Sequence, residues 1–191
     1  MWVEPGDLGG SNGGDVGGNG HDAGTDHGLN GGSAKPDQPE RVFLVVVDGS
    51  SEWQSALRLA CRRAAQISGR LALLHIMEPL EFQHWIAVEE KMRQEVREEA
   101  EARLATIADE VHVLIGSHPV IHIRDGSPID ELMKLIDEDR SISTLVLAAR
   151  GGSDGPGPLI HHVTGKGMAR MRVPVTIVPA LLSEADIDAL A

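Results

Sequence analysis

The stretch Val42-Phe43-Leu44-Val45-Val46-Val47-Asp48-Gly49-Ser50 decides the fold of this chain. Its apolar residues run without a polar interruption and are mostly β-branched, which is typical of a strand covered on both faces. Asp48, Gly49 and Ser50 end the strand, and Ser50 or Ser51 is placed to cap a helix that runs from about residue 53 to 67. A buried strand followed at once by a helix is the first half of a βαβ unit.

The same alternation continues toward the C-terminus. Further strands are expected at 71–77, 120–123, 143–148 and 175–178. Helices are expected from about Phe82 or Val88 to 115, from 128 to 137, and in a stretch that ends near 171. Strands that alternate with helices must be parallel and joined by right-handed crossovers. The pattern therefore predicts an α/β fold: a three-layer, doubly wound sheet of five parallel strands.

Two features of the expected helices can be tested in a structure. The longest helix carries an apolar stripe that should pack on the sheet, with a coiled-coil partner as the alternative. Its members are Met92, Val96, Ala100, Leu104, Ile107, Val111 and Leu114. The helix after Gly126 should open at Ser127 and Pro128, with Glu131 as the partner in a capping box.

Length and composition set the domain plan. The chain has 191 residues, of which 1–39 are rich in glycine, 40–180 alternate as described, and 181–191 form a short helix or tail. The first segment cannot bury enough apolar surface to fold, so we expect a disordered tail. The tail contains His21, Asp22, Asp26 and His27, which suit a metal, but a solvated tail is the simpler interpretation and no metal site is predicted.

The net charge and the hydropathy of the chain limit the partners and the location that we expect for it. A net charge of −12 repels phosphate backbones, so nucleic acid is not an expected partner. No apolar run is long enough to cross a membrane and no signal peptide opens the chain, so we expect a cytoplasmic protein with no membrane partner. Cys61 is the one cysteine, which excludes an internal disulfide, and its helical setting predicts a small buried apolar residue.

Ligands of doubly wound sheets bind at the carboxyl ends of the strands. That rule points to Asp48-Gly49-Ser50, to Ile76-Met77-Glu78-Pro79, and to the glycine-rich loop after Ala149. Together with the turn at 124–128 and the closing segment at 173–178, these motifs resemble the universal stress protein family from Arg41 to Pro179. The resemblance implies a stress-response or signalling module.

Many members of that family bind ATP, so the resemblance implies ATP with magnesium as the ligand. Asp48, Gly49 and Ser50 would contact the ribose or base, and the backbone of Ile76 and Met77 would meet the adenine edge. The phosphates would lie on a loop of the form G-x2-G-x9-G-[S/T], because glycine amides can approach them closely.

That loop departs from the family pattern in this chain. In the family register, the motif positions fall on Ala148, Gly151, His161 and His162, and only Gly151 matches. If the loop slides, Gly152, Gly155 and Gly165 reproduce the glycine spacing and Lys166 takes the hydroxyl position, followed by a helix at 166–172. Pro156 and Pro158 would also remove two amide donors from the loop.

Two functions therefore stay open. One is a module that binds ATP at the carboxyl edge of its sheet. The other is a module that has lost the nucleotide and acts through dimerisation and partner contacts. The resemblance implies a homodimer through the edge of the last strand, Val175–Val178. No catalytic residue is predicted, and an enzyme activity would be slow ATP hydrolysis at most.

Overall fold

The computed structural model describes residues 41–79, 86–153 and 155–191. Within these residues, five strands form one sheet in the order β3-β2-β1-β4-β5, and every neighbouring pair is parallel. The strands are β1 (Val42–Val46), β2 (Arg70–Met77), β3 (Val120–Asp125), β4 (Ile142–Ala148) and β5 (Val175–Val178). The predicted α/β fold with five parallel strands is confirmed. The expected N-terminal tail and Phe82 lie outside the described residues.

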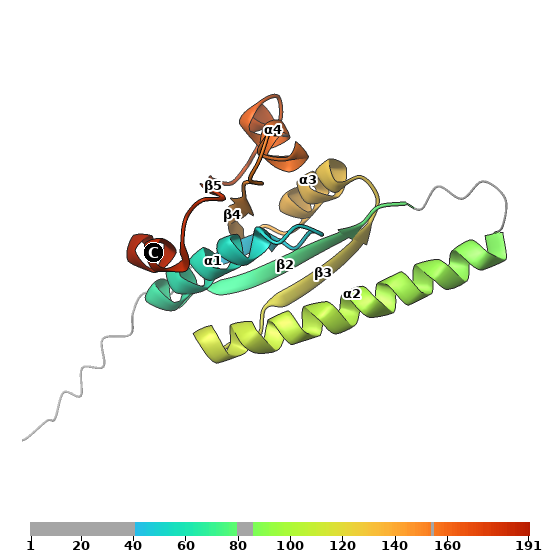
Figure 1. Cartoon of the computed structure of the whole chain (residues 1–191), viewed down its shortest axis with the longest axis horizontal. Coiled ribbons are helices and arrows are strands. Elements are labelled where there is room, and N and C mark those ends of the chain that lie inside the picture. Colours follow the sequence, from blue (N-terminus) through green and yellow to red (C-terminus); the bar gives the residue numbers. More distant parts are fainter. Residues whose placement is uncertain (1–40, 80–85, 154) are drawn as a thin grey trace, which may run out of the picture. The chain divides into compact units, whose positions relative to one another are not determined.

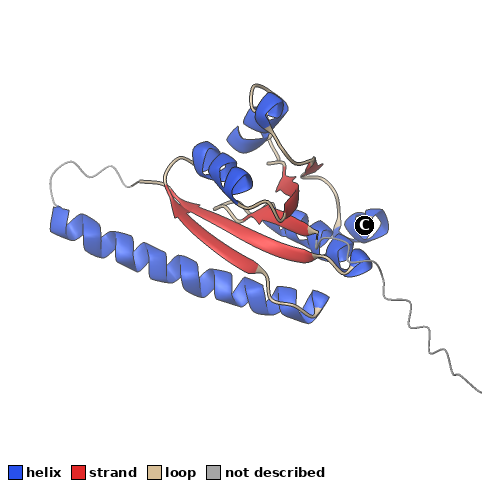
Figure 2. Cartoon of the chain, turned by 180° about the vertical axis from the view of Figure 1, so that it is seen from behind, coloured by secondary structure: helices blue, strands red, loops and turns tan. Residues whose placement is uncertain are grey.

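Helices cover both faces of the sheet (Figures 1 and 2). They are α1 (Trp53–Ile67), α2 (Ile86–Ile115), α3 (Pro128–Glu138), α4 (Pro158–Thr164), the 3-10 helix η1 (Met168–Arg170) and α5 (Glu184–Leu190). One apolar cluster joins the sheet to α1, α2 and α5, and a second joins the opposite face to α3 and α4. The arrangement has the three layers that the sequence predicts.

The central strand β1 is buried along its whole length. Phe43 and Val45 belong to the cluster under α1 and α2, whereas Leu44 and Val46 belong to the cluster under α3. Successive side chains of a strand point to opposite faces, so both faces of β1 need apolar residues. This explains the uninterrupted run of apolar residues in the sequence.

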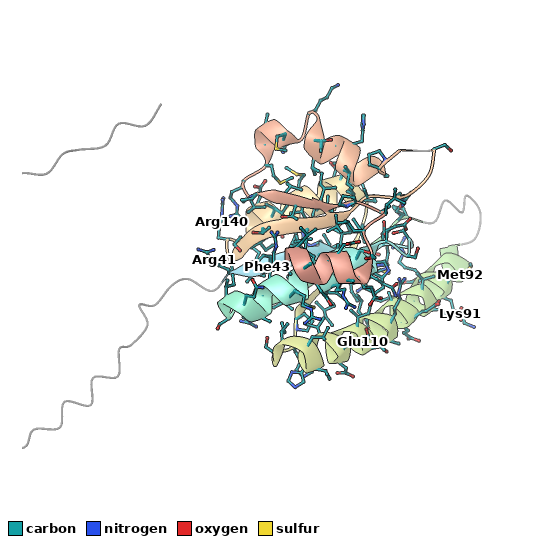
Figure 3. The ribbon with its side chains drawn as sticks, turned by 60° about the vertical axis from the view of Figure 1, so that its left-hand side comes forward. Arg41, Phe43, Lys91, Met92, Glu110 and Arg140 are labelled. Carbon is teal, nitrogen blue, oxygen red and sulfur yellow. The ribbon has the colours of Figure 1, made fainter. Side chains whose placement is uncertain are left out.

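Helix α2 is longer than the sheet that it covers. Its 30 residues span about 45 Å, whereas the eight residues of β2 span about 26 Å. Leu104 is therefore buried, but Met92, Val96 and Leu114 are 38%, 40% and 58% exposed. Figure 3 shows Lys91 and Met92 toward one end of α2 and Glu110 toward the other. The apolar stripe packs on the sheet only through its middle.

Two of the predicted caps are wrong. Glu52, not Ser50 or Ser51, is the N-cap residue of α1, and its side chain makes no capping hydrogen bond. Ser127 does precede α3 with Pro128 in the first turn, but no capping box forms. The Glu131 carboxylate instead lies among cations, 3.6 Å from Arg124 and in a salt bridge with Lys134.

The C-terminal segment docks on α1. Helix α5 opens with a capping box between Ser183 and Asp186, and its Ile187 is buried in the cluster around α1. Arg58 of α1 donates two hydrogen bonds, of 2.8 and 2.7 Å, to the carboxylate of Asp188. Cys61 is also buried under this layer, as predicted. No helix in the described part of the chain is long and apolar enough to span a membrane.

Candidate functional site

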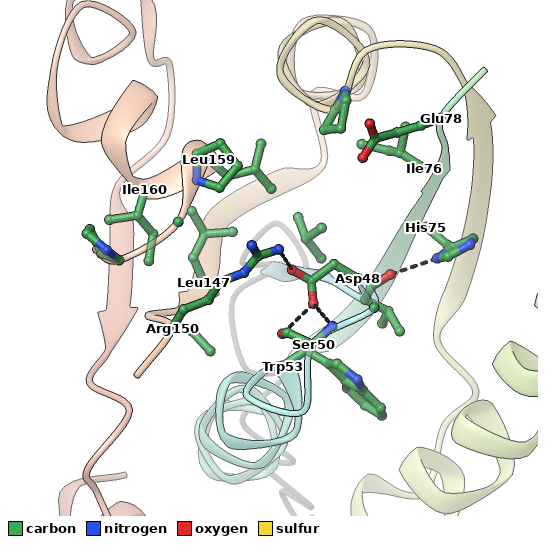
Figure 4. A pocket seen from close by; sticks show the side chains of 18 residues that line it. Asp48, Ser50, Trp53, His75, Ile76, Glu78, Leu147, Arg150, Leu159 and Ile160 are labelled. Atoms are coloured by element: carbon green, nitrogen blue, oxygen red, sulfur yellow. Dashed lines mark hydrogen bonds and ion pairs between the residues drawn. The ribbon is translucent and has the colours of Figure 1, made fainter. Parts of the chain in front are cut away.

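A cavity of about 310 Å³ lies at the carboxyl ends of β1 and β4 (Figure 4). These strands are neighbours in the sheet, and the connections that leave them run to opposite faces, α1 to one and α4 to the other. In doubly wound sheets such a switch point opens a crevice for ligands. The lining residues come from the ends of three strands, from the turn after β1, from the loop before α4, and from the first turns of α1, α3 and α4.

Asp48 is held in place at the floor of this cavity. One carboxylate oxygen accepts hydrogen bonds from the Ser50 amide at 3.0 Å and from the Ser50 hydroxyl at 2.6 Å. The other oxygen lies 3.5 Å from a guanidinium nitrogen of Arg150, which follows β4 (Figure 4). The turn after β1 therefore presents a fixed carboxylate, and its lone pairs beyond these contacts can accept hydrogen bonds from a ligand.

His75 supports the same turn from β2. Its Nδ1 lies 2.7 Å from the carbonyl oxygen of Val47, which can only accept, so Nδ1 carries the proton. In the neutral ring Nε2 is then an acceptor. Arg103 of α2 donates to the carbonyl oxygen of Asp48 at 3.3 Å and stacks over Trp53 at 5.5 Å. These contacts fix the backbone that carries Asp48.

The loop between β4 and α4 forms the opposite wall. The amide of Arg150 donates to the carbonyl oxygen of Pro156 at 3.2 Å, which closes the loop on itself. Gly157 has φ +100° and ψ 157°, a conformation that only glycine adopts readily, and it places Pro158 at the start of α4. A second cavity, of about 480 Å³, lies along this loop between Arg150 and His161.

Glu52 reaches the same loop from the start of α1. Its carboxylate accepts a hydrogen bond of 3.3 Å from the amide of Gly151. Its own amide and that of Gly151 hold the pKa of the Glu52 carboxyl below its usual range. The Glu52 carboxyl group is therefore ionised at neutral pH. Its negative charge lies next to the Gly151 amide, which the sequence predicts as a donor to a phosphate.

The structure places most of the predicted site residues along three cavities. Four line the cavity at the switch point: Asp48, Gly49, Ser50 and Ile76. Met77 lines an adjoining cavity of about 450 Å³ with Ile76 and Glu78, and Gly151 and Gly155 line the cavity along the loop. Gly152 lies in the loop with φ +112°.

Gly165 and Lys166 are not brought to the cavities that contain Asp48 or Gly151. The sliding loop would need residues 156–164 to be unstructured and a helix to follow at 166–172. Instead, α4 occupies Pro158–Thr164, Gly165 is its C-cap residue, and a single turn of 3-10 helix follows. The predicted helical stretch to residue 171 is thus interrupted after Thr164.

Sequence reasoning missed several residues that line the site. Arg150 and His75 line the cavity and Glu52 lies beside it, whereas Glu78 belongs to the strand-end motif that the sequence predicts. Arg150 lies two residues after β4 and His75 lies near the end of β2, so their positions at strand ends were a usable signal. Glu52 gave no such signal, because its contact with Gly151 joins segments that are far apart in the sequence.

The lining combines apolar walls with a few charged groups. Val46, Leu147, Leu159 and Ile160 supply apolar surface, while Asp48, Glu78 and Arg150 supply charge. Such a mixture suits a ligand with a flat apolar ring and hydrogen-bonding groups at its rim. Among the described residues, no group of three or more His, Cys, Asp or Glu side chains could hold a metal ion.

Solved structures share this fold. Universal stress protein UspA from Lactobacillus plantarum matches with a TM-score of 0.60 at 18% identity, over 74% of this chain and 99% of that one. A universal stress protein family member from Burkholderia pseudomallei matches with a TM-score of 0.52 at 20% identity, over 72% and 95% of the two chains. A family protein from Arabidopsis thaliana, solved with AMP bound, matches with a TM-score of 0.50 at 18% identity, over 74% and 92%.

Comparisons of the sequence with known proteins identify the family of this chain. A search of curated proteins found no match. The model of the universal stress protein family matches residues 40–179, which include every strand of the sheet and every residue of the three cavities. This chain belongs to the universal stress protein family.

Proposed function

We propose that this protein binds an adenine nucleotide in the cavity at the ends of β1 and β4, and that it acts in the cytoplasm as a stress-response or signalling module. The observation that carries the proposal is the fixed carboxylate of Asp48 at the switch point, opposite apolar surface from Leu147 and Ile160. The related structure from Arabidopsis thaliana holds AMP, which supports an adenine ligand in this fold.

Each part of the ligand has a candidate partner. The ribose hydroxyls would donate to Asp48, and the adenine would lie against the apolar surface of Leu147 and Ile160, with its edge toward Ile76. The phosphates of ATP, with magnesium, would extend along the loop that holds Gly151 and Gly155. No catalytic step is part of this proposal.

Calorimetry and thermal shift with AMP, and with ATP and magnesium, test the proposal at millimolar ligand. Asp48→Ala should weaken binding by about tenfold or more, because hydrogen bonds to a charged acceptor are among the stronger ones. Asp109→Ala is the matched control, since it removes an exposed carboxylate of α2 that does not line the cavity. Absence of heat and of any thermal shift with both ligands would refute the proposal.

The second candidate function is an interaction module without a nucleotide. Two observations favour it: the Glu52 carboxylate already occupies the Gly151 amide, and Pro156 and Pro158 have no amide hydrogen to donate. In either function we propose a homodimer through the free edge of β5, where Val175, Thr176 and Ile177 are only partly buried. Light scattering at micromolar concentration checks this, and a monomer would contradict it.

A further inference from the structure

Carboxylates outnumber cationic side chains at the switch-point cavity. Asp48 and Glu78 line it, and ionised Glu52 lies nearby against Gly151 of the loop after β4. Among the described lining residues, Arg150 is the one lysine or arginine, and it is already paired with Asp48 at 3.5 Å. A ligand that brings further negative charge would therefore meet a net repulsion.

Several of the backbone donors that a phosphate chain could use are engaged or missing. The Gly151 amide donates to Glu52, and the Arg150 amide donates to the carbonyl oxygen of Pro156. Pro156 and Pro158 line the cavity along the loop but have no amide hydrogen. Four positions of this wall thus offer a phosphate no free backbone donor.

The same cavity suits the uncharged part of a nucleotide. Leu147, Leu159 and Ile160 form an apolar wall on the side of Arg150, and Glu78 lies across the cavity from them (Figure 4). A base could lie against that wall, while its exocyclic amine donates to Glu78 and the ribose hydroxyls donate to Asp48. The volume of about 310 Å³ is also at the small end of the usual range for ligand sites.

We propose that the site takes a nucleoside that carries no phosphate, and that affinity falls with each phosphate added. The inference rests on the proposed function, because it concerns the same cavity and the same contacts with base and ribose. It adds a selectivity: Glu52 weakens the binding of phosphate by its charge and by accepting the hydrogen bond of the Gly151 amide.

Titration of the full chain with adenosine, AMP, and ATP with magnesium tests the inference by calorimetry. We expect adenosine to bind most tightly, with affinity lower by about threefold to tenfold for each phosphate, as expected for repulsion between partly screened charges. Tighter binding of ATP than of adenosine would overturn the inference and leave the proposed function standing. Absence of binding by all three ligands would overturn both.

A charge-neutral variant isolates the role of Glu52. Glu52→Gln should raise the affinity for AMP by about threefold to tenfold and change that for adenosine by less than about twofold. The matched control is Glu110→Gln, which removes an exposed carboxylate of α2 outside the cavity lining and should change neither affinity. An unchanged ratio of the two affinities in a folded Glu52→Gln protein would overturn the inference.

Discussion

Arg172 donates a hydrogen bond of 2.9 Å from its guanidinium to the carbonyl oxygen of Asp139, the C-cap residue of α3. The same guanidinium also donates to the carbonyl oxygen of Ile136. The last carbonyl groups of a helix have no partner within the helix, so this side chain satisfies them from the segment that leads into β5.

Arg172→Met should therefore destabilise the fold. The change keeps the apolar stem but removes the donors to the end of α3, which costs about 1.5–3 kcal/mol for hydrogen bonds of a charged group. Urea denaturation followed by circular dichroism measures the loss. Arg170→Met is the control, because Arg170 is exposed in the neighbouring turn, and an equal effect of both changes would contradict the assignment.

The docking of α5 should depend on pH. Hydrogen bonds from Arg58 and Arg62 hold the pKa of the Asp188 carboxyl well below its usual range. A depressed pKa stabilises the fold above the ordinary carboxyl pKa, near 4, and this stabilisation is lost as the pH falls toward the folded-state value. Asp188→Asn should lower the urea midpoint at pH 7.

That deficit should shrink as the pH falls below about 4, since a protonated aspartic acid and the asparagine that replaces it are both uncharged. Urea midpoints at pH 7, 5 and 3 give the comparison, and Asp109→Asn controls for loss of an exposed carboxylate. A deficit that stays constant down to pH 3 would show that packing, not charge, holds α5.

Gly157→Ala should distort the loop wall of the cavity. Its backbone lies in a region of φ and ψ that side chains with a Cβ rarely adopt, at a cost of about 1–3 kcal/mol. The Cβ of an alanine at position 157 would lie 3.5 Å from the Arg150 side chain, an ordinary van der Waals contact. The expected loss of stability therefore comes from the backbone conformation. Gly49→Ala is a control for stability, because a Cβ there meets nothing within 4 Å.

Cys61 should be unreactive in the folded protein. Burial raises the pKa of its thiol to about 11, and the side chain is 3% exposed. A thiol reagent such as DTNB at pH 8 should label it at the rate of unfolding and at once in urea. Rapid labelling under native conditions would contradict the packing of α1 on the sheet.

The sheet was predictable because most of its strands are rich in apolar, β-branched residues and are followed by polar residues or glycine. Burial on both faces requires such a run at Val42–Val46, and its β-branched residues favour a strand over a helix. The extent of packing along α2 was not predictable, because Met92 and Val96 continue the stripe beyond the strands that could cover it. A periodic pattern of apolar residues predicts which face of a helix is apolar. It does not predict how much of that face the sheet covers, because this depends on the tertiary structure.

The candidate site was predictable at the strand ends and not in the loop. Asp48 and Ile76 follow from the rule that ligands bind at carboxyl edges. The position of α4 did not follow from glycine spacing, although Gly157-Pro158 carries a helix-start signal that could have located it. The contact between Glu52 and Gly151 depends on how two loops meet, which local sequence does not encode.

The central place of β1 also affects how the chain is made. Phe43 of β1 pairs with Leu71 of β2 on one side and with Thr144 of β4 on the other. One edge of β1 therefore has no partner strand until β4 has left the ribosome. Pairing between such distant segments is slow, because the conformational entropy of a long loop must be lost before any stabilising contact forms. Among the strands that the structure describes, the one made of apolar residues alone is thus the one that stays half-paired the longest during synthesis.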